Sequence, residues 1–141
     1  MNNRTCAIIK PDAVKNNNDG KIIDHILKNG YKILSAKKIH MTKKQAEGFY
    51  AVHIGKPFYV ELTDFMSSGP SWVIALEKEN AVEEWRKTIG TTNPVDAKEG
   101  TIRKLYATSL GENAVHGSDS DENAKIEIGF FFSEAELIAC Q

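Results

Sequence analysis

A histidine beside hydroxyl and acidic residues offers the clearest chemistry in the sequence. His116 is followed by Gly117 and then by Ser-Asp-Ser at residues 118–120, a composition typical of a helix N-terminus. Such an end presents free N–H groups that favour anions, and Gly117 leaves open space beside the imidazole. Neutral histidine is a nucleophile whose pKa lies near ambient pH. The segment indicates a nucleophile that faces an anion, with a turn histidine beside an ordinary helix cap as the alternative.

A carboxylate further along the chain is a candidate partner for that histidine. Glu127 falls in a helix expected over residues 118–128, at the edge of its apolar face, where a carboxylate needs a partner. A histidine–carboxylate pair fixes the ring tautomer and makes the other ring nitrogen more nucleophilic. The alternative is an exposed glutamate on the solvated side of the helix.

Arginine is scarce, and its placement indicates a phosphate site. The chain has three arginines against fifteen lysines, and Arg86 and Arg103 lie beside or within the segment 91–116. A guanidinium binds phosphate through two parallel hydrogen bonds, which lysine cannot do. Thr92 adds a hydroxyl in the same stretch. The alternative is two isolated surface cations and an ordinary turn.

Several classes of site are excluded by missing motifs. The chain has neither a Gly-x-x-x-x-Gly-Lys-Ser/Thr loop nor a Gly-x-Gly-x-x-Gly segment, so it is not a P-loop enzyme. His, Cys, Asp and Glu nowhere show metal-ligand spacing, so we expect no protein-held metal, although Mg²⁺ carried mainly by phosphates is allowed. Cys6 and Cys140 are expected to be free thiols, one in a buried strand and one in the tail, in a reducing compartment.

Length and composition set the broad class. A chain of 141 residues with 41% hydrophobic content predicts one globular domain over residues 1–141. No apolar run approaches the roughly 18 residues of a membrane span, and the N-terminus lacks a signal-peptide layout, so we expect a cytoplasmic protein. The net charge of −1 lacks the basic surplus of a nucleic-acid coat, so nucleic acid is not the expected main partner.

Short apolar runs alternate with amphipathic segments along the chain. The runs predict strands at residues 4–10, 31–39, 72–76 and 130–132. The amphipathic segments predict helices at residues 19–29, 42–53, 57–66, 80–89 and 118–128, and a terminal helix to about residue 137. Thr42 and Gln45 fit a capping box, Asn80 is a helix cap, residues 10–12 form a turn, and residues 91–116 form a long ordered loop. This order indicates one α/β or α+β sandwich.

Seven segments in a fixed order resemble the nucleoside diphosphate kinase family, in its bacterial form with a short C-terminus. The most specific is Asn113-Ala114-Val115-His116-Gly117-Ser118-Asp119-Ser120, which is similar to the family's active-site signature. The others are Ile9-Lys10-Pro11-Asp12, Phe49-Tyr50, Lys56-Pro57-Phe58, Ser68-Gly69-Pro70, Thr92-Asn93-Pro94 and Gly100-Thr101-Ile102-Arg103.

The resemblance implies a catalytic role for five residues. His116 would be the phosphorylated nucleophile and would attack through Nδ1. Glu127 would hold the other ring nitrogen, and Ser118 would bond to that carboxylate. Tyr50 would lie against the histidine and the transferring group, and Lys10 would reach the phosphate.

The resemblance also implies a nucleotide-binding role for a second set. Arg86, Thr92 and Arg103 would grip the phosphates, and His53 would approach the β-phosphate. The remaining contacts go to the sugar and the base: Lys10 and Asn113 to the ribose hydroxyls, Phe58 stacked on the base, and Leu110 on its other face. Stacking with few base-edge hydrogen bonds gives low base selectivity.

The family implies a ferredoxin-like α+β sandwich, with a four-stranded antiparallel sheet covered by helices. It implies transfer of the γ-phosphate of a nucleoside triphosphate to a nucleoside diphosphate, by a ping-pong mechanism through a phosphohistidine and with Mg²⁺. It also implies a homo-oligomer, a tetramer or a hexamer built from dimers. Trp72 and Leu105 depart from the family pattern, because small aliphatic and acidic residues are usual there.

Three other classes compete with this enzyme. A non-catalytic nucleotide-binding module of the same fold would usually lose a site residue, and every matched position is intact. A nucleic-acid binder would need a basic stripe. A small α/β domain with a pH-sensitive histidine is compatible with composition alone, but not with seven matched segments.

Overall fold

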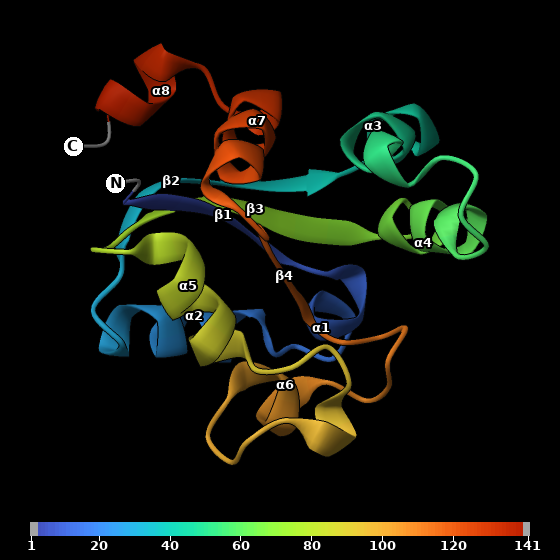
Figure 1. The fold of residues 1–141 in the computed structure, drawn as a ribbon, viewed down its shortest axis with the longest axis horizontal. Coiled ribbons are helices and arrows are strands. Elements are labelled where there is room, and N and C mark those ends of the chain that lie inside the picture. Colours follow the sequence, from blue (N-terminus) through green and yellow to red (C-terminus); the bar gives the residue numbers. More distant parts are fainter. Residues whose placement is uncertain (1–2, 140–141) are drawn as a thin grey trace.

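The computed structural model describes residues 3–139, which are built around one four-stranded sheet. The strands lie in the order β2-β3-β1-β4, and all three neighbouring pairs are antiparallel (Figure 1). Their bounds are β1 Arg4–Ile9, β2 Lys32–His40, β3 Pro70–Glu77 and β4 Val115–Gly117. This is the ferredoxin-like α+β architecture that the resemblance implied.

Helices cover both faces of the sheet. Helices α3, α7 and α8 lie on one face, and α2 and α5 lie on the other (Figure 1). The helix bounds are α1 Pro11–Lys15, α2 Asp19–Lys28, α3 Lys43–Phe49, α4 Tyr59–Met66, α5 Ala81–Ile89, α6 Ile102–Tyr106, α7 Asp121–Phe131 and α8 Glu134–Ala139, with short 3₁₀ turns at Ala51–His53 and Pro94–Asp96. Within the described residues, no helix is long and apolar enough to cross a membrane.

The register of the two inner strands brings distant segments together. β1 pairs with β3 from Arg4–Glu77 to Ile9–Trp72, and on its other side it pairs with β4. In that second pair His116 lies opposite Ile8. The end of β1, where Lys10 follows, therefore lies beside the strand that carries the histidine.

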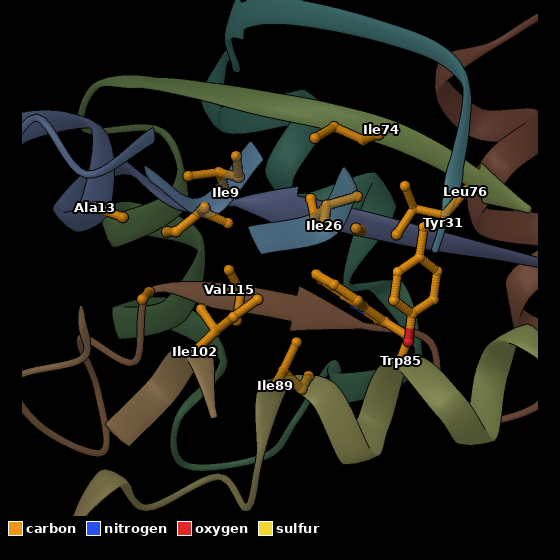
Figure 2. Close-up of a cluster of buried hydrophobic side chains, with 13 residues drawn as sticks. Ile9, Ala13, Ile26, Tyr31, Ile74, Leu76, Trp85, Ile89, Ile102 and Val115 are labelled. Atoms are coloured by element: carbon orange, nitrogen blue, oxygen red, sulfur yellow. The ribbon is translucent and has the colours of Figure 1, made fainter. Parts of the chain in front are cut away.

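Two apolar clusters fix the helices to the sheet. Figure 2 shows the first, in which Trp85 and Ile89 of α5 and Ile26 of α2 pack against sheet residues such as Ile74. Each large side chain that is fully buried contributes about 1.5–3 kcal/mol. The second cluster joins the opposite face of the sheet to α3, α4, α7 and α8.

One predicted strand was wrong. Residues 130–132 were expected as the fourth strand, but Phe130 and Phe131 end α7 and Phe132 is its C-cap. Aromatic residues favour strands only where a pleated surface receives them. Here Phe132 is buried among the residues of the second cluster, and packing of the helix decides the conformation. The fourth strand is instead Val115–Gly117, at the end of the segment 91–116 that was predicted as a loop.

Helix boundaries were predicted with mixed success. The capping box of Thr42 and Gln45 is confirmed, although the helix ends at Phe49 and a 3₁₀ turn carries His53. Asn80 is the N-cap of α5, but its backbone is left-handed (φ 55°) and its amide bonds to Glu83 instead of capping the helix.

Three further segments differ from the prediction. α7 begins at Asp121 with Ser120 as its cap, not at residue 118. Residues 10–12 lead into α1, because Pro11 occupies the first turn of a helix, where its missing N–H costs nothing. The loop over residues 91–116 contains α6.

The two departures from the family pattern are accommodated. Trp72 packs against the first cluster, and its Nε1–H donates a hydrogen bond to Asp19 Oδ2 at 3.0 Å. Leu105 is 52% exposed on α6. Cys6 is a free thiol buried in β1, as predicted, and the prediction for Cys140 lies outside the described residues.

Candidate active site

His116 and Glu127 form a hydrogen-bonded pair between β4 and α7. The Nε2 atom of His116 lies 2.7 Å from Glu127 Oε1, and the two side chains are 16% and 17% exposed. Ser118 Oγ donates to the same oxygen at 2.8 Å. Because a carboxylate oxygen accepts, the imidazole proton lies on Nε2, and Nδ1 is left with a free lone pair.

Ser118 also ties this pair to the centre of the sheet. Its Oγ accepts a hydrogen bond from the backbone N–H of Cys6 in β1 at 3.2 Å. Ser118 is fully buried. The carboxylate of Glu127 is thus held by a hydroxyl whose own position the sheet fixes.

Aromatic side chains pack edge-on around the imidazole. The ring centroid of Phe49 lies 5.4 Å from that of His116, and the ring of Tyr50 lies 6.1 Å away. The Tyr50 hydroxyl is buried and has no hydrogen-bond partner among residues 3–139. Burial, together with the negative charge of Glu127, raises the pKa of Tyr50 far above its usual value. The phenol is therefore neutral, and it packs against the histidine without competing for its proton.

Trp85 holds the main chain of the histidine from the other side. Its Nε1–H donates to the His116 carbonyl oxygen at 3.1 Å, and its side chain is fully buried. A Cβ at Gly117 would come within 2.8 Å of Trp85 Cδ1. Glycine after the histidine is therefore required by the indole behind it, as well as leaving space beside the ring.

The histidine opens onto a pocket of about 1030 Å³. Seven of the predicted site residues line it: Lys10, His53, Arg86, Thr92, Arg103, Asn113 and His116. Three of these are cations, and Lys87 and Lys98 also line the pocket, so five cations stand against the three carboxylates of Glu83, Asp119 and Asp121. A concave site with this charge fits a polyanion.

Lys10 is a buried cation with a fixed position. It is 7% exposed, and its Nζ donates to Asn113 Oδ1 at 2.9 Å. Burial and the nearby Arg103 guanidinium lower the pKa of Lys10 to about 8, against the opposing effect of the Asp12 carboxylate. A negatively charged ligand in the pocket would reverse part of this cost.

Arg103 braces the segment before the histidine. Its guanidinium donates to three main-chain oxygens, those of Asn113, Gly90 and Val115, at 3.4, 2.9 and 2.9 Å. Burial and the neighbouring Arg86 lower the pKa of Arg103 to about 10, so it stays charged near neutral pH. Two of its five N–H groups remain for a ligand.

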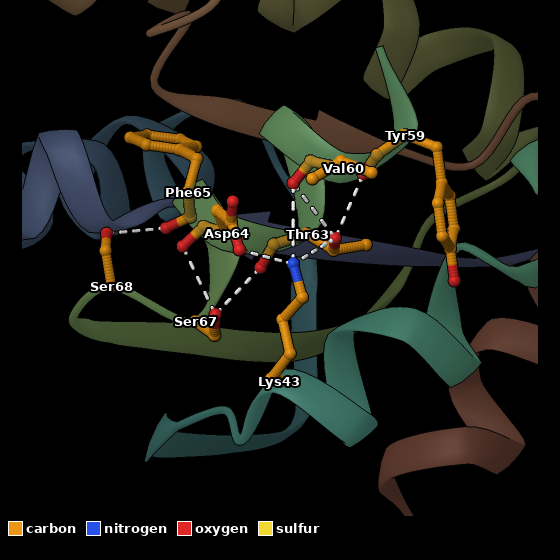
Figure 3. A network of polar contacts seen from close by, with 8 residues as sticks. All are labelled: Lys43, Tyr59, Val60, Thr63, Asp64, Phe65, Ser67 and Ser68. Atoms are coloured by element: carbon orange, nitrogen blue, oxygen red, sulfur yellow. Dashed lines mark hydrogen bonds and ion pairs between the residues drawn. The ribbon is translucent and has the colours of Figure 1, made fainter. Parts of the chain in front are cut away.

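The segment between α3 and α4 carries two predicted nucleotide-binding residues, of which His53 lines the pocket and Phe58 does not. The rings of His53 and Phe58 lie 5.2 Å apart, and His53 Nδ1 is buried without a hydrogen-bond partner among the described residues. Lys43 of α3 joins the two helices, because its ammonium pairs with Asp64 and donates to Thr63 Oγ1 of α4 (Figure 3).

The structure does not bring all predicted residues to the pocket wall. Tyr50, Ser118 and Glu127 lie behind the imidazole and support it. Phe58 and Leu110 are 46% and 58% exposed and lie outside the residues that line the pocket.

Phe49 and Trp85 were not predicted as site residues. Both read as apolar helix positions in the sequence, and their spacing does not distinguish them from other core residues.

Acidic groups reach the pocket from the segment that follows the histidine, Asp119 just before α7 and Asp121 in its first turn. Asp119 lines it, and a hydrogen bond from Asn123 lowers the pKa of that carboxyl group. Over residues 3–139, His, Cys, Asp and Glu form no group of three or more that could hold a metal ion. The carboxylate chemistry suits a hard cation that arrives with a ligand's phosphates.

A ferredoxin-like sandwich with an oriented histidine in a cationic pocket defines a phosphoryl-transfer protein. The family model for nucleoside diphosphate kinase matches residues 3–137. A nucleoside diphosphate kinase of Persephonella marina is 55% identical over 135 residues, which cover 96% of each chain. One from Flavobacterium psychrophilum is 58% identical over 134 residues, which cover 95% of this chain and 96% of the relative. This chain belongs to the nucleoside diphosphate kinase family.

Solved structures of the family agree with the fold. The nucleoside diphosphate kinase of Aquifex aeolicus has a TM-score of 0.93 and 42% identity, and the match covers 95% of this chain and 97% of that one. A halophilic nucleoside diphosphate kinase from Halobacterium salinarum, solved in complex with CDP, has a TM-score of 0.91 and 34% identity over 96% and 91% of the two chains. Enzymes of this family need a divalent cation.

Proposed function

We propose that this chain transfers the γ-phosphoryl group of a nucleoside triphosphate to a nucleoside diphosphate through a phosphohistidine on His116. The observation that carries this proposal is the 2.7 Å contact of His116 Nε2 with Glu127, in a ring that lines a pocket with Lys10 and Arg103. The contact supports Nδ1 as the free nucleophilic nitrogen.

The reaction divides into two similar halves. The lone pair of Nδ1 attacks the γ-phosphorus, the bond to the β–γ bridging oxygen breaks, and the nucleoside diphosphate leaves. A second nucleoside diphosphate then attacks the phosphohistidine with a terminal phosphate oxygen, and the P–N bond breaks. The proton stays on Nε2 throughout, and Glu127 Oε1 accepts a hydrogen bond from it and stabilises the positive charge that develops on the ring.

The cations of the pocket hold the phosphates in place. Phosphoryl transfer depends mainly on positioning and on neutralising charge at the equatorial oxygens. We assign Arg86, Thr92 and the two remaining N–H groups of Arg103 to the phosphates, because all three residues line the pocket. His53 also lines the pocket and is assigned to the β-phosphate.

The sugar and the base take the outer part of the site. Lys10 and Asn113 are already joined by a hydrogen bond of 2.9 Å, and we assign this pair to the ribose hydroxyls, with Lys10 also reaching the phosphate. Phe58 is 46% exposed, which leaves a ring face for stacking on a base. Leu110 is assigned to the other face of the base. Stacking accepts every base, which fits low base selectivity.

We propose that Mg²⁺ is the divalent cation and that it enters on the nucleotide phosphates. Asp119 has the hard oxygen ligands that Mg²⁺ prefers, and its carboxylate is held ionised beside the pocket. When bound, the metal would neutralise charge on the phosphate oxygens.

We further propose that residues 1–141 act as one domain within a cytoplasmic homo-oligomer, a tetramer or a hexamer built from dimers. The four strands form a single sheet, which supports one domain. The free buried thiol of Cys6 suits a reducing compartment.

The phosphoenzyme is the direct test of this function. The intact protein is mixed briefly with ATP and Mg²⁺ and weighed by mass spectrometry, and excess GDP is then added. We expect a gain of about 80 Da that survives base, is lost in acid and disappears with GDP as GTP forms. His116→Ala should show no gain. An unchanged mass together with measurable nucleotide binding would overturn the transfer and leave a binding module.

A further inference from the structure

Asp12 is a buried acid beside the pocket to which the reaction above gives no role. It lies in the first turn of α1, two residues after Lys10, and is 4% exposed. Its Oδ2 accepts a hydrogen bond from the backbone N–H of Ala114 at 3.0 Å. Its Oδ1 is buried and has no hydrogen-bond partner within residues 3–139. Burying an ionised carboxylate costs free energy unless its charge is paired and hydrogen-bonded.

The partner of Asp12 is a strained turn. Ala114 has a φ of 71°, and the other non-glycine residues with positive φ in the described part of the chain are Asn17 and Asn80. Asparagine tolerates this left-handed region, whereas alanine does not favour it. The Val115 N–H donates to the Asn113 oxygen at 2.8 Å and closes a tight three-residue turn around Ala114.

The segment from Lys10 to Asp12 grips this turn on both sides. The Lys10 N–H donates to the Ala114 oxygen at 2.8 Å, while Asp12 accepts from the Ala114 N–H. The turn begins at Asn113, whose side chain accepts a hydrogen bond from the Lys10 ammonium, and it ends at Val115, the residue directly before His116. Relaxation of Ala114 would therefore displace both the nucleophile and the buried cation.

Charge links the same residues. The ionisable groups that act on Lys10 are the Arg103 guanidinium of α6 and the Asp12 carboxylate of α1, and Arg86 of α5 acts in turn on Arg103. Asp12 is the one anion in this set, and it opposes the effect of Arg103 on Lys10. Burial raises the pKa of Asp12, while the Ala114 N–H and Lys10 lower it.

We propose that Asp12 is a positioning residue for phosphoryl transfer, which holds the strained turn at Ala114 and serves as the counter-ion of Lys10. The role rests on the proposed function, because it acts through His116 and Lys10. The carboxylate does not touch the nucleotide. It fixes the main chain ahead of the nucleophile and keeps a buried ammonium charged at the pocket wall.

Asp12→Asn and Asp12→Ala separate the two parts of this role. Asparagine keeps an oxygen acceptor for the Ala114 N–H but removes the charge, whereas alanine removes both. Asp19→Asn is the matched control, because Asp19 also accepts one hydrogen bond, from Trp72, and does not line the pocket. Activity of each variant is followed from pH 6 to pH 10 in the full-length chain, after the unsubstituted chain has been shown to form a phosphoenzyme.

We expect Asp12→Asn to lower kcat at pH 6.5 less than Asp12→Ala does, and to move the alkaline fall of kcat/KM to lower pH by about one pH unit. Asp12→Ala should lower kcat at every pH by about tenfold or more, because the nucleophile is displaced. Asp19→Asn should leave the pH profile unchanged. A purely structural aspartate would lower the melting temperature without moving the alkaline limb.

A profile for Asp12→Asn that superimposes on that of the unsubstituted chain would overturn the proposal. The titration of Lys10 by NMR, without nucleotide, gives a second readout if Asp12→Ala does not fold. The Lys10 titration should have a lower midpoint in Asp12→Asn than in the unsubstituted chain. An unchanged midpoint would count against the counter-ion role. If the unsubstituted chain forms no phosphoenzyme, the proposed function fails and the positioning role fails with it, while this titration still decides whether Asp12 is the counter-ion of Lys10.

Discussion

At the scale of single residues, the reaction depends on which nitrogen of His116 carries the proton. Glu127 Oε1 receives two hydrogen bonds, from His116 Nε2 at 2.7 Å and from Ser118 Oγ at 2.8 Å. The carboxylate thereby selects the tautomer with a free Nδ1 and stabilises the ring when Nδ1 becomes bonded to phosphorus. The sequence alone left Glu127 equally compatible with an exposed helix position.

Glu127→Gln tests this orientation. The amide keeps the size of the side chain but loses the charge that stabilises a cationic ring, so we expect kcat to fall by about 100-fold while nucleotide binding is kept. Steady-state kinetics and nucleotide titration measure the two effects. The control is Glu136→Gln on α8, whose carboxylate pairs with Lys37 away from the pocket. Equal kcat values for Glu127→Gln and the unsubstituted chain would contradict the role of Glu127.

Lys10 gives nucleotide binding a pH dependence. Its pKa is lowered to about 8 by burial and by Arg103, so the free protein loses this charge as the pH rises through about 8. Bound phosphate favours the charged form, so binding takes up a proton and weakens with rising pH. We expect the Kd for ADP to rise by up to about tenfold per pH unit above pH 8. Isothermal titration should show this slope in the unsubstituted chain and not in Lys10→Met.

At the scale of elements, β4 and α5 act as one unit. Trp85 of α5 donates a hydrogen bond to the His116 carbonyl oxygen at 3.1 Å, and the next residue, Arg86, lines the pocket onto which His116 opens. The packing between the two elements leaves no room for a side chain at Gly117. The contact between α5 and β4 therefore helps to set the position of His116 relative to Arg86, which we propose as a phosphate ligand.

Gly117→Ala should disturb this contact. The new Cβ would meet Trp85 Cδ1 at 2.8 Å and Ile89 Cδ1 at 3.1 Å, both in a closed core. We expect a loss of about 1–3 kcal/mol in the free energy of unfolding, together with lower kcat. Gly129→Ala is the control in α7, where a Cβ meets nothing within 4 Å and should stabilise the helix by about 0.5–1 kcal/mol. Chemical denaturation measures both, and equal signs for the two variants would contradict the packing argument.

At the scale of the whole molecule, the sequence predicted the fold class and left the arrangement open. The amphipathic pattern located α2 and α5, and the apolar runs located β1, β2 and β3, because burial on one face leaves a period in the sequence. The fourth strand was misplaced because Val115–Gly117 is too short to show a period, while residues 130–132 are aromatic and end a helix. Short edge strands are specified by pairing partners, which here lie in β1.

The candidate site, like the fold, was predicted from the sequence only in part. Residue types could indicate His116, Arg86 and Arg103, since their chemistry is uncommon in the chain. The residues that support the imidazole of His116 could not be predicted from the sequence. Trp85 and Phe49 have the same pattern as other buried residues, and they contact His116 only because the fold brings them together. The strained backbone of Ala114 could not be predicted from the sequence either, because an alanine does not indicate a left-handed conformation.

The measurement that tests the central claim most directly identifies the nitrogen that bears phosphorus. Phosphoenzyme is made with ATP and Mg²⁺, unfolded in base, and examined by ³¹P NMR with ¹⁵N-labelled histidine. The Nε2–Glu127 hydrogen bond of 2.7 Å predicts phosphorus on Nδ1 of His116. Phosphorus on Nε2, or on any residue other than His116, would contradict the account.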